Sequence, residues 1–171
     1  MKITTGKLVA AAMMAALCAV ATMVIAIPSP MQGYVNLGDC IVLLCGWLLG
    51  PWWGFAAAAI GSAMADVLLS YAVYAPATFL IKGAMALVCG LIAHQKSQGR
   101  RMVSGVAAEA IMVAGYFGFA GLIMGEGLAA ASSVPGNLFQ GAVGIVAGLA
   151  LYALLQKSGS FRHLKQAGII Q

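Results

Sequence analysis

The stretch PATFLIKGAMALVCGLIAH, residues 76–94, decides the class of fold, because it is a long apolar segment with a single charge. It begins at Pro76, and proline is favoured in the first turn of a helix. About 20 residues of apolar helix are needed to cross the hydrocarbon of a bilayer. An ionisable side chain inside such a segment is costly to insert, so Lys82 is a candidate functional residue. The stretch therefore predicts a transmembrane helix that holds one cation.

The rest of the chain has the same character. Of its 171 residues 63% are hydrophobic and only 8% are charged, and the mean hydropathy is +0.99. Soluble domains carry about 25% charged residues, and disordered chains have low hydrophobicity. This composition excludes a soluble globular enzyme and a disordered chain, and it predicts an integral membrane protein.

Six apolar segments with short connections predict an all-α membrane protein, with six transmembrane helices in one bundle and a single domain over residues 1–171. The second segment is short for a span. Pro135 opens the sixth as Pro76 opens the fourth, and a short basic tail, 156–171, follows. The expected spans are 6–27, 35–50, 52–71, 76–94, 102–124 and 134–155.

The positive charges indicate the orientation of these spans. Eight of the nine Lys and Arg residues lie before or at the very start of the first span, between the fourth and fifth, or after the sixth. The loops 28–34, 72–75 and 125–133 contain no Lys or Arg. Because cytoplasmic loops carry the excess of Lys and Arg, the N- and C-termini are predicted to be cytoplasmic. We expect a multi-pass protein of a bacterial cell membrane.

Polar side chains within the spans gather in the outer half of the bundle. At about 1.5 Å of rise per residue, Asp66 on the third span and Lys82 on the fourth lie at nearly the same depth, which predicts an ion pair. The polar and aromatic residues at this level predict an outward-facing pocket for a small molecule. The candidate binding residues are Asn36, Asp39, Tyr71, Tyr74, Thr78, Lys82, Tyr116, Asn137 and Gln140.

Several of these residues also have a purely structural interpretation. The pair Asp66–Lys82 joins two helices whether or not it contacts a ligand. Tyr71 and Tyr74 fit an aromatic belt at the membrane surface, and Asp39 fits the start of a helix, where a carboxylate complements the dipole. Asn137 fits a helix cap. Glu109 lies deeper than the others and is not one of the candidate binding residues.

The chain lacks the motifs of the common membrane enzymes. It contains no G-x-x-x-x-G-K-[ST] phosphate loop. Its two histidines, His94 and His163, are expected on the cytoplasmic side, away from the pocket. Its four cysteines show no metal-binding spacing. We therefore expect no catalytic residues, no metal and no cofactor, and a binding protein rather than an enzyme.

Four motifs follow one another between residues 34 and 83: Tyr34-Val-Asn-Leu-Gly-Asp39, Leu48-Leu-Gly-Pro51, Gly61-Ser-Ala-Met-Ala-Asp66 and Tyr74-Ala-Pro-Ala-Thr-Phe-Leu-Ile-Lys-Gly83. Together they resemble the substrate-binding S component of an energy-coupling factor (ECF) vitamin transporter. The resemblance implies a subunit that binds a vitamin or its precursor at the outer side. It also implies association with a transmembrane T component and two cytoplasmic ATPases. We expect no contact with nucleic acid, because the cations lie at the ends of apolar segments and form no basic run with interleaved aromatic residues.

The resemblance extends to the first span and to the class of ligand. A face of small residues on the first span, Ala11, Ala15 and Ala19, is expected to contact the T component, with packing inside this chain as the alternative. The subgroup is closest to members for pyridoxine-type vitamins or hydroxymethylpyrimidine, and a riboflavin-type ligand is the alternative. The loops around 28–35 and 125–133 are expected to close over the ligand as lids.

Two other classes of function stay open at this point. A stand-alone proton-coupled transporter would use Asp66, Lys82 and Glu109 as its proton path. A structural or assembly subunit would bind no small molecule.

Overall fold

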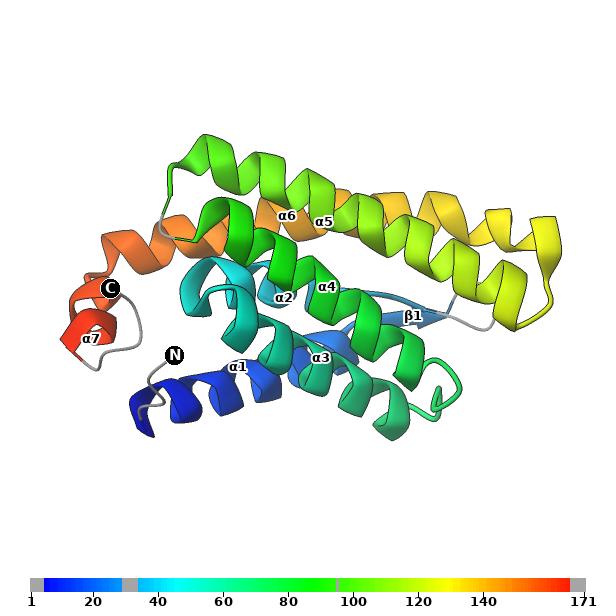
Figure 1. Cartoon of the computed structure of the whole chain (residues 1–171), viewed down its shortest axis with the longest axis horizontal. Coiled ribbons are helices and arrows are strands. Elements are labelled where there is room, and N and C mark those ends of the chain that lie inside the picture. Colours follow the sequence, from blue (N-terminus) through cyan, green and yellow to red (C-terminus); the bar gives the residue numbers. More distant parts are fainter. Residues whose placement is uncertain (1–4, 29–33, 95, 167–171) are drawn as a thin grey trace.

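Helices that run alternately up and down make up most of the computed structural model, which describes residues 5–28, 34–94 and 96–166 (Figure 1). The structure confirms a helical architecture. The helices are α1 (Thr5–Val24), α2 (Gly38–Leu49), α3 (Pro51–Leu68), α4 (Ala75–Ala93), α5 (Gln98–Gly118), α6 (Val134–Lys157) and α7 (Ser160–Gln166).

The prolines mark the starts of helices, as the sequence predicts. A proline occupies one of the first two positions of α3, α4 and α6. At this position the missing N–H of proline would have no partner within the helix in any case. Gly50 precedes α3 with φ +80°, a conformation that favours glycine, and it turns the chain sharply between α2 and α3.

A short pair of β-strands interrupts the helical pattern and corrects the adjoining ends of the expected spans 6–27 and 35–50, while residues 29–33 of the expected loop lie outside the described residues. The antiparallel strands β1 (Ala26–Pro28) and β2 (Tyr34–Asn36) pair with Ile27 opposite Val35. They occupy the last residues of the expected first span and the first residues of the expected second one. Their backbone pairing satisfies polar groups that could not stay unpaired in an apolar environment.

The helix α2 is therefore shorter than predicted and lies at the centre of the bundle. Its 12 residues extend for about 18 Å, against about 30 Å of bilayer hydrocarbon. Leu43 and Trp47 are fully buried, and the Trp47 Nε1 donates a hydrogen bond to Ser104 Oγ at 2.9 Å. Because α1, α3, α4 and α6 all pack against α2, it is a core element that ends well short of the bundle's full length.

The remaining elements differ from the prediction at their ends. The end of the expected fifth span is a π-helical turn, η1 (Phe119–Ile123), and the following loop contains a 3₁₀ helix, η2 (Gly127–Ser133). The tail 156–171, expected as a simple basic extension, contains α7. Among the described residues, four segments are long and apolar enough to cross a membrane: Thr5–Val24, Ala75–Ala93, Gln98–Ile123 and Gly127–Lys157.

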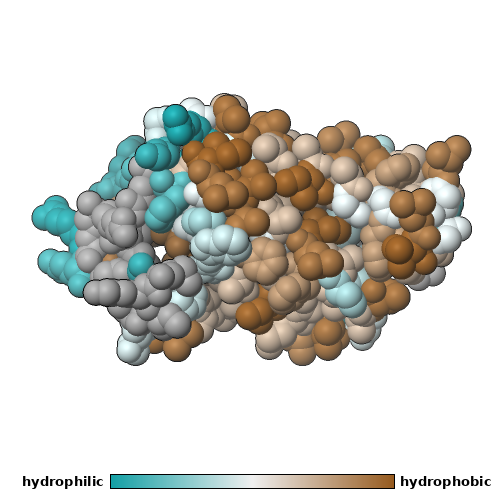
Figure 2. Space-filling view, viewed as in Figure 1, coloured by the Kyte–Doolittle hydropathy of each residue, from teal (hydrophilic) through white to brown (hydrophobic). Residues whose placement is uncertain are grey.

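The two ends of the bundle differ in chemistry. One end, here called the basic end, carries the start of α1, the α4–α5 turn and α7; the other, the hairpin end, carries β1, β2 and the α3–α4 turn (Figure 1). Hydrophilic side chains gather at the basic end, and apolar ones cover most of the remaining visible face (Figure 2). Large apolar side chains such as Leu80, Leu91 and Val146 are exposed along the helices. This surface is suited to contact with lipid tails.

Candidate ligand-binding site

A cavity lies at the hairpin end, beyond the start of the short helix α2. Its volume is about 50 Å³. Seven of the nine candidate binding residues line it: Asn36, Tyr74, Thr78, Lys82, Tyr116, Asn137 and Gln140. The structure thus brings together side chains from β2, α4, α5 and α6 that are far apart in the sequence.

Charged and amide groups connect four elements at the base of the cavity. Lys82 of α4 forms an ion pair with Asp39 in the first turn of α2. The other carboxylate oxygen of Asp39 accepts a hydrogen bond at 2.6 Å from Gln140 Nε2 of α6. The Oε1 atom of Gln140 in turn accepts a hydrogen bond at 2.7 Å from the backbone N–H of Asn36. The cation and the carboxylate are both buried, and each is compensated by the other.

This network corrects the predicted pair Asp66–Lys82. Lys82 and Asp66 lie on neighbouring helices, but α2 places Asp39 directly against the ammonium group of Lys82. Asp66 instead accepts a hydrogen bond at 2.5 Å from the hydroxyl of Tyr34. Counting residues along a helix predicts depth in the membrane, but it does not predict which way a side chain points around the helix axis.

Asp66 belongs to the cavity wall, together with two residues that the sequence analysis did not select. Tyr34 of β2 and Ser62 of α3 both line the cavity beside Asp66. The hydroxyl of Tyr34 donates its hydrogen bond to the Asp66 carboxylate and so fixes the orientation of that group. The spacing of Ser62 and Asp66, four residues apart on a predicted helix, is the signal that could have identified them together.

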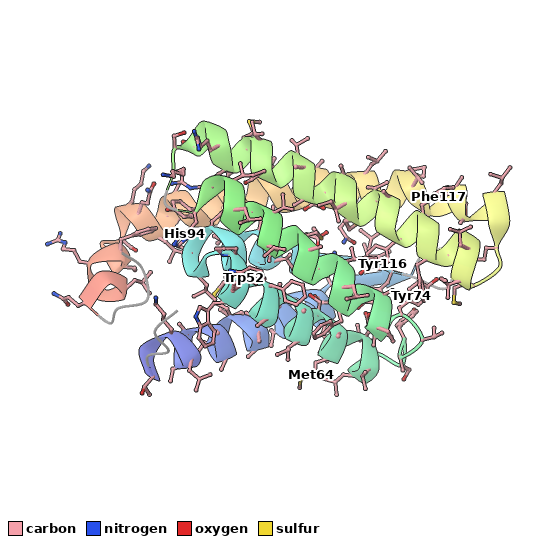
Figure 3. All side chains as sticks on the ribbon, in the orientation of Figure 1. Trp52, Met64, Tyr74, His94, Tyr116 and Phe117 are labelled. Atoms are coloured by element: carbon pink, nitrogen blue, oxygen red, sulfur yellow. The ribbon has the colours of Figure 1, made fainter. Side chains whose placement is uncertain are left out.

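Aromatic rings form another part of the wall. The ring of Tyr74 packs against Phe119 of η1, with centroids 5.4 Å apart. The hydroxyl of Tyr116 shares a hydrogen bond of 3.0 Å with Thr78 Oγ1. Tyr74 and Tyr116 come from different elements and both lie toward the hairpin end, whereas His94 lies toward the basic end (Figure 3). Such a wall is suited to a flat, partly polar ring.

Two of the candidate binding residues do not line the cavity. Asp39 is completely buried behind Lys82 and Gln140, where it fixes both side chains. Tyr71 packs its ring against Tyr34, with the centroids 4.9 Å apart. Asp39 and Tyr71 therefore support residues of the cavity wall and do not themselves form it.

The expected lids are described only in part. Residues 29–33 of the first lid lie outside the described residues, while Tyr34 and Asn36 beside them line the cavity. In the second loop, Ser133 of η2 also lines the cavity. Whether these loops close over a ligand stays a prediction.

Glu109 of α5 lies apart from the cavity, deeper in the bundle. A Cβ atom added at Gly144 of α6 would lie 2.9 Å from Asp39 Cβ and 3.2 Å from Glu109 Oε1, so this glycine allows both acidic side chains to approach α6. Glu109 is buried, and neither of its carboxyl oxygens has a hydrogen-bond partner among the described residues. On its other side it borders an apolar groove between α5 and α6 that includes Val113 and Leu138.

The small-residue face of α1 contacts α3, which favours the alternative of packing inside the chain, and its contact with the T component stays a prediction. A Cβ atom added at Gly61 of α3 would lie 2.2 Å from the backbone oxygen of Ala15, so the two helices are in contact there. Ala11 is buried and Ala19 is half-buried. The more exposed small residues of α1 are Ala12 and Ala16, one position further along the chain.

The described residues hold no cluster of His, Cys, Asp or Glu side chains that could ligate a metal ion. The four cysteines are buried free thiols. The polar groups of the cavity are hydroxyls, amides, one carboxylate and one ion-paired ammonium group. Such an arrangement can recognise a small polar molecule through hydrogen bonds and ring contacts.

Comparison with known proteins identifies a matching family and a relative. The family model described as "ECF-type riboflavin transporter, S component" matches residues 2–157. A protein of Pyrococcus woesei, described as an uncharacterized protein in the gap 3′ region, is 36% identical over 140 residues. That alignment covers 81% of this chain and 93% of the relative.

Proposed function

The chain belongs to the family of ECF-type riboflavin transporter S components, and we propose that it is the substrate-binding subunit of an ATP-driven importer for a small vitamin or vitamin precursor. The family makes it a membrane transport protein and not an enzyme. S components of this kind work with a T component and ATPases, which supply the driving force.

The observation that carries the proposal is the cavity at the hairpin end. Several elements contribute polar or aromatic side chains to it, from Asn36 of β2 to Gln140 of α6. The ion pair between Lys82 and Asp39 leaves the ammonium group largely neutralised. A buried polar cavity without a metal-ligating cluster among the described residues favours binding over catalysis.

The ligand we favour is a single heteroaromatic ring of the pyridoxine or hydroxymethylpyrimidine type. The tyrosine rings of the cavity wall suit the flat faces of a single ring, and the hydroxyl and amide groups beside them suit its polar edge. A riboflavin-type ligand, named in the description of the family, is the alternative.

Uptake measurements test the proposed function. Cells that contain the chain together with a T component and ATPases are expected to accumulate a labelled vitamin of the correct class. Cells with a defective ATPase should accumulate none. Equal uptake by the chain alone would contradict the role of a binding subunit.

One observation favours a second candidate function, a proton-coupled transporter. Glu109 is a buried carboxyl group without a hydrogen-bond partner among the described residues, and it lies beside the Asp39–Lys82 pair. Intramembrane carboxyl groups are typical of proton relays. This alternative requires uptake without ATPases and its loss in Glu109→Gln, whereas the binding-subunit proposal requires ligand binding that survives Glu109→Gln.

A further inference from the structure

Two side-chain oxygen atoms on α3 have no hydrogen-bond partner among the described residues, although both residues line the cavity. Ser62 is 1% exposed and Asp66 is 2% exposed, yet within the described residues neither Ser62 Oγ nor Asp66 Oδ2 accepts or donates a hydrogen bond. An unpaired buried polar group costs roughly 1–3 kcal/mol. A bound ligand that pairs with both groups would remove this cost.

The two groups lie on the same face of α3. Residues four positions apart on a helix have Cβ atoms separated by about 5–6 Å. Tyr34 holds the other carboxylate oxygen of Asp66 through its hydroxyl, which fixes the orientation of the carboxyl group. Ser62 and Asp66 thus present a hydroxyl next to a carboxylate oxygen in a defined position.

The charges around the cavity restrict what can pair with these groups. Lys82 is already bound to Asp39, so no unpaired cation of the described cavity wall is available for a phosphate or carboxylate of the ligand. Asp66 has no cationic partner among the described residues and accepts hydrogen bonds when it is ionised. The part of the cavity wall that α3 contributes therefore favours a ligand that brings a hydrogen-bond donor and carries no negative charge.

We propose that Ser62 and Asp66 recognise the edge of an amino-substituted nitrogen heterocycle, with the Asp66 carboxylate accepting from its N–H group and the Ser62 hydroxyl donating to the adjacent ring nitrogen. An edge of this kind offers a donor beside an acceptor, the complement of the carboxylate and hydroxyl on α3. The rings of Tyr74 and Tyr116 supply contacts with its faces. This inference rests on the proposed binding function and narrows its ligand class.

The probes are 4-amino-5-hydroxymethyl-2-methylpyrimidine and an analogue in which a methyl group replaces the amino group. Binding of each to the purified full chain in lipid nanodiscs is measured by calorimetry. We expect the methyl analogue to bind at least about tenfold more weakly, because it leaves Asp66 Oδ2 unpaired. Because both probes act on the unchanged protein, this comparison does not depend on the folding of a variant.

Variants of the chain provide the second arm. Asp66→Asn places an amide against the amino group and is expected to weaken binding of the aminopyrimidine at least about tenfold. It should add little to the loss already seen with the methyl analogue, since both changes remove the same contact. Ser62→Ala should weaken binding several-fold. Glu109→Gln is the matched control, an acid-to-amide change at a buried residue that does not line the cavity.

The outcomes separate this inference from the proposed function. Equal binding of the two pyrimidines, or unchanged binding by Asp66→Asn, overturns the proposal that Ser62 and Asp66 recognise the edge of the heterocycle. The proposed binding function would still stand. Binding of pyridoxine or riboflavin but not of the aminopyrimidine has the same meaning. If none of these compounds binds, both the inference and the proposed function fail.

Discussion

The ion pair between Asp39 and Lys82 is the residue-level feature on which the site depends. It places a charge pair inside an apolar bundle, at the junction of α2 and α4. Gln140 and the backbone of Asn36 extend the contact to α6 and β2. The pair therefore holds the base of the cavity together and removes a free charge from it.

A double-mutant cycle tests this pairing. Lys82→Met or Asp39→Asn alone leaves one partner of a buried pair without compensation, which costs about 3–5 kcal/mol. We expect the double variant to lose much less than the sum of the two single losses in thermal unfolding. The same cycle with Asp66→Asn in place of Asp39→Asn should be nearly additive. Strong coupling of Lys82 to Asp66 and none to Asp39 would contradict the structure.

Tyr34 offers a second test at the scale of a residue. Tyr34→Phe removes the hydroxyl that orients Asp66, so we expect binding of the ligand to weaken roughly 5- to 150-fold, the equivalent of about 1–3 kcal/mol. Tyr71→Phe is the matched control, because it keeps the ring that packs against Tyr34. Calorimetric titration measures both. Unchanged binding by Tyr34→Phe, or an equal loss in Tyr71→Phe, would contradict a specific role of the Tyr34 hydroxyl.

Among the elements, the short helix α2 makes room for the cavity. It begins at Gly38, and β2 replaces the helical turns that a full-length span would have there. Tyr34 and Asn36 of β2 consequently reach the cavity beside residues of α4 and α6. A full-length α2 would fill the space that the ligand is proposed to occupy.

The helix α1 carries a prediction about assembly. Ala16 lies on its more exposed face, whereas Ala15 contacts α3 at Gly61. If the T component docks on the exposed face, Ala16→Trp should preserve ligand binding and abolish ATP-dependent uptake, because the indole ring holds the partner helix away. Ala15→Trp should instead lower the melting temperature and weaken ligand binding.

Binding and uptake are measured on the same membranes for both variants. Full uptake by Ala16→Trp would place the docking surface elsewhere on the chain. Loss of uptake in Ala15→Trp without any loss of stability would show that the T component contacts the face that contains Ala11, Ala15 and Ala19.

The elements also show how far the sequence predicts the structure. The bounds of α4 and α6 differ by two residues at most from the predicted spans, because a proline and a long apolar run mark each of them. The hairpin and the short α2 were not predicted, since a short apolar run such as 35–50 suits a strand or a buried helix equally well. Most of the site residues were found by their depth, but the partner of Lys82 required the packing of α2.

At the scale of the whole molecule, the distribution of charge predicts orientation. Lys7 near the start of α1, Arg100 after the α4–α5 turn and Lys157 at the end of α6 all lie toward the basic end. We propose six crossings, with the basic end in the cytoplasm and the cavity open to the outside. Gly99 at the basic end suits a labelling test, because it is exposed and a Cβ atom added there meets no other atom within 4 Å.

Accessibility labelling measures this orientation. Gly99→Cys, in a chain whose four buried cysteines are replaced by serine or alanine, should react with a membrane-impermeant thiol reagent only after the cells are opened. Val73→Cys, in the exposed α3–α4 turn, should react in intact cells. The reverse pattern would place the cavity on the cytoplasmic side and contradict the proposed direction of uptake.

The central claim is that the cavity at the hairpin end holds a small vitamin-like molecule, and mass spectrometry of the ligand that co-purifies with the protein tests it most directly. From cells grown in rich medium, the unchanged chain and Glu109→Gln are expected to retain the same small heteroaromatic compound in near-stoichiometric amount. Asn137→Ala, which alters the cavity wall, should retain far less of it. Equal retention by Asn137→Ala, or the absence of any such compound together with no melting shift on addition of the candidate vitamins, would contradict the account.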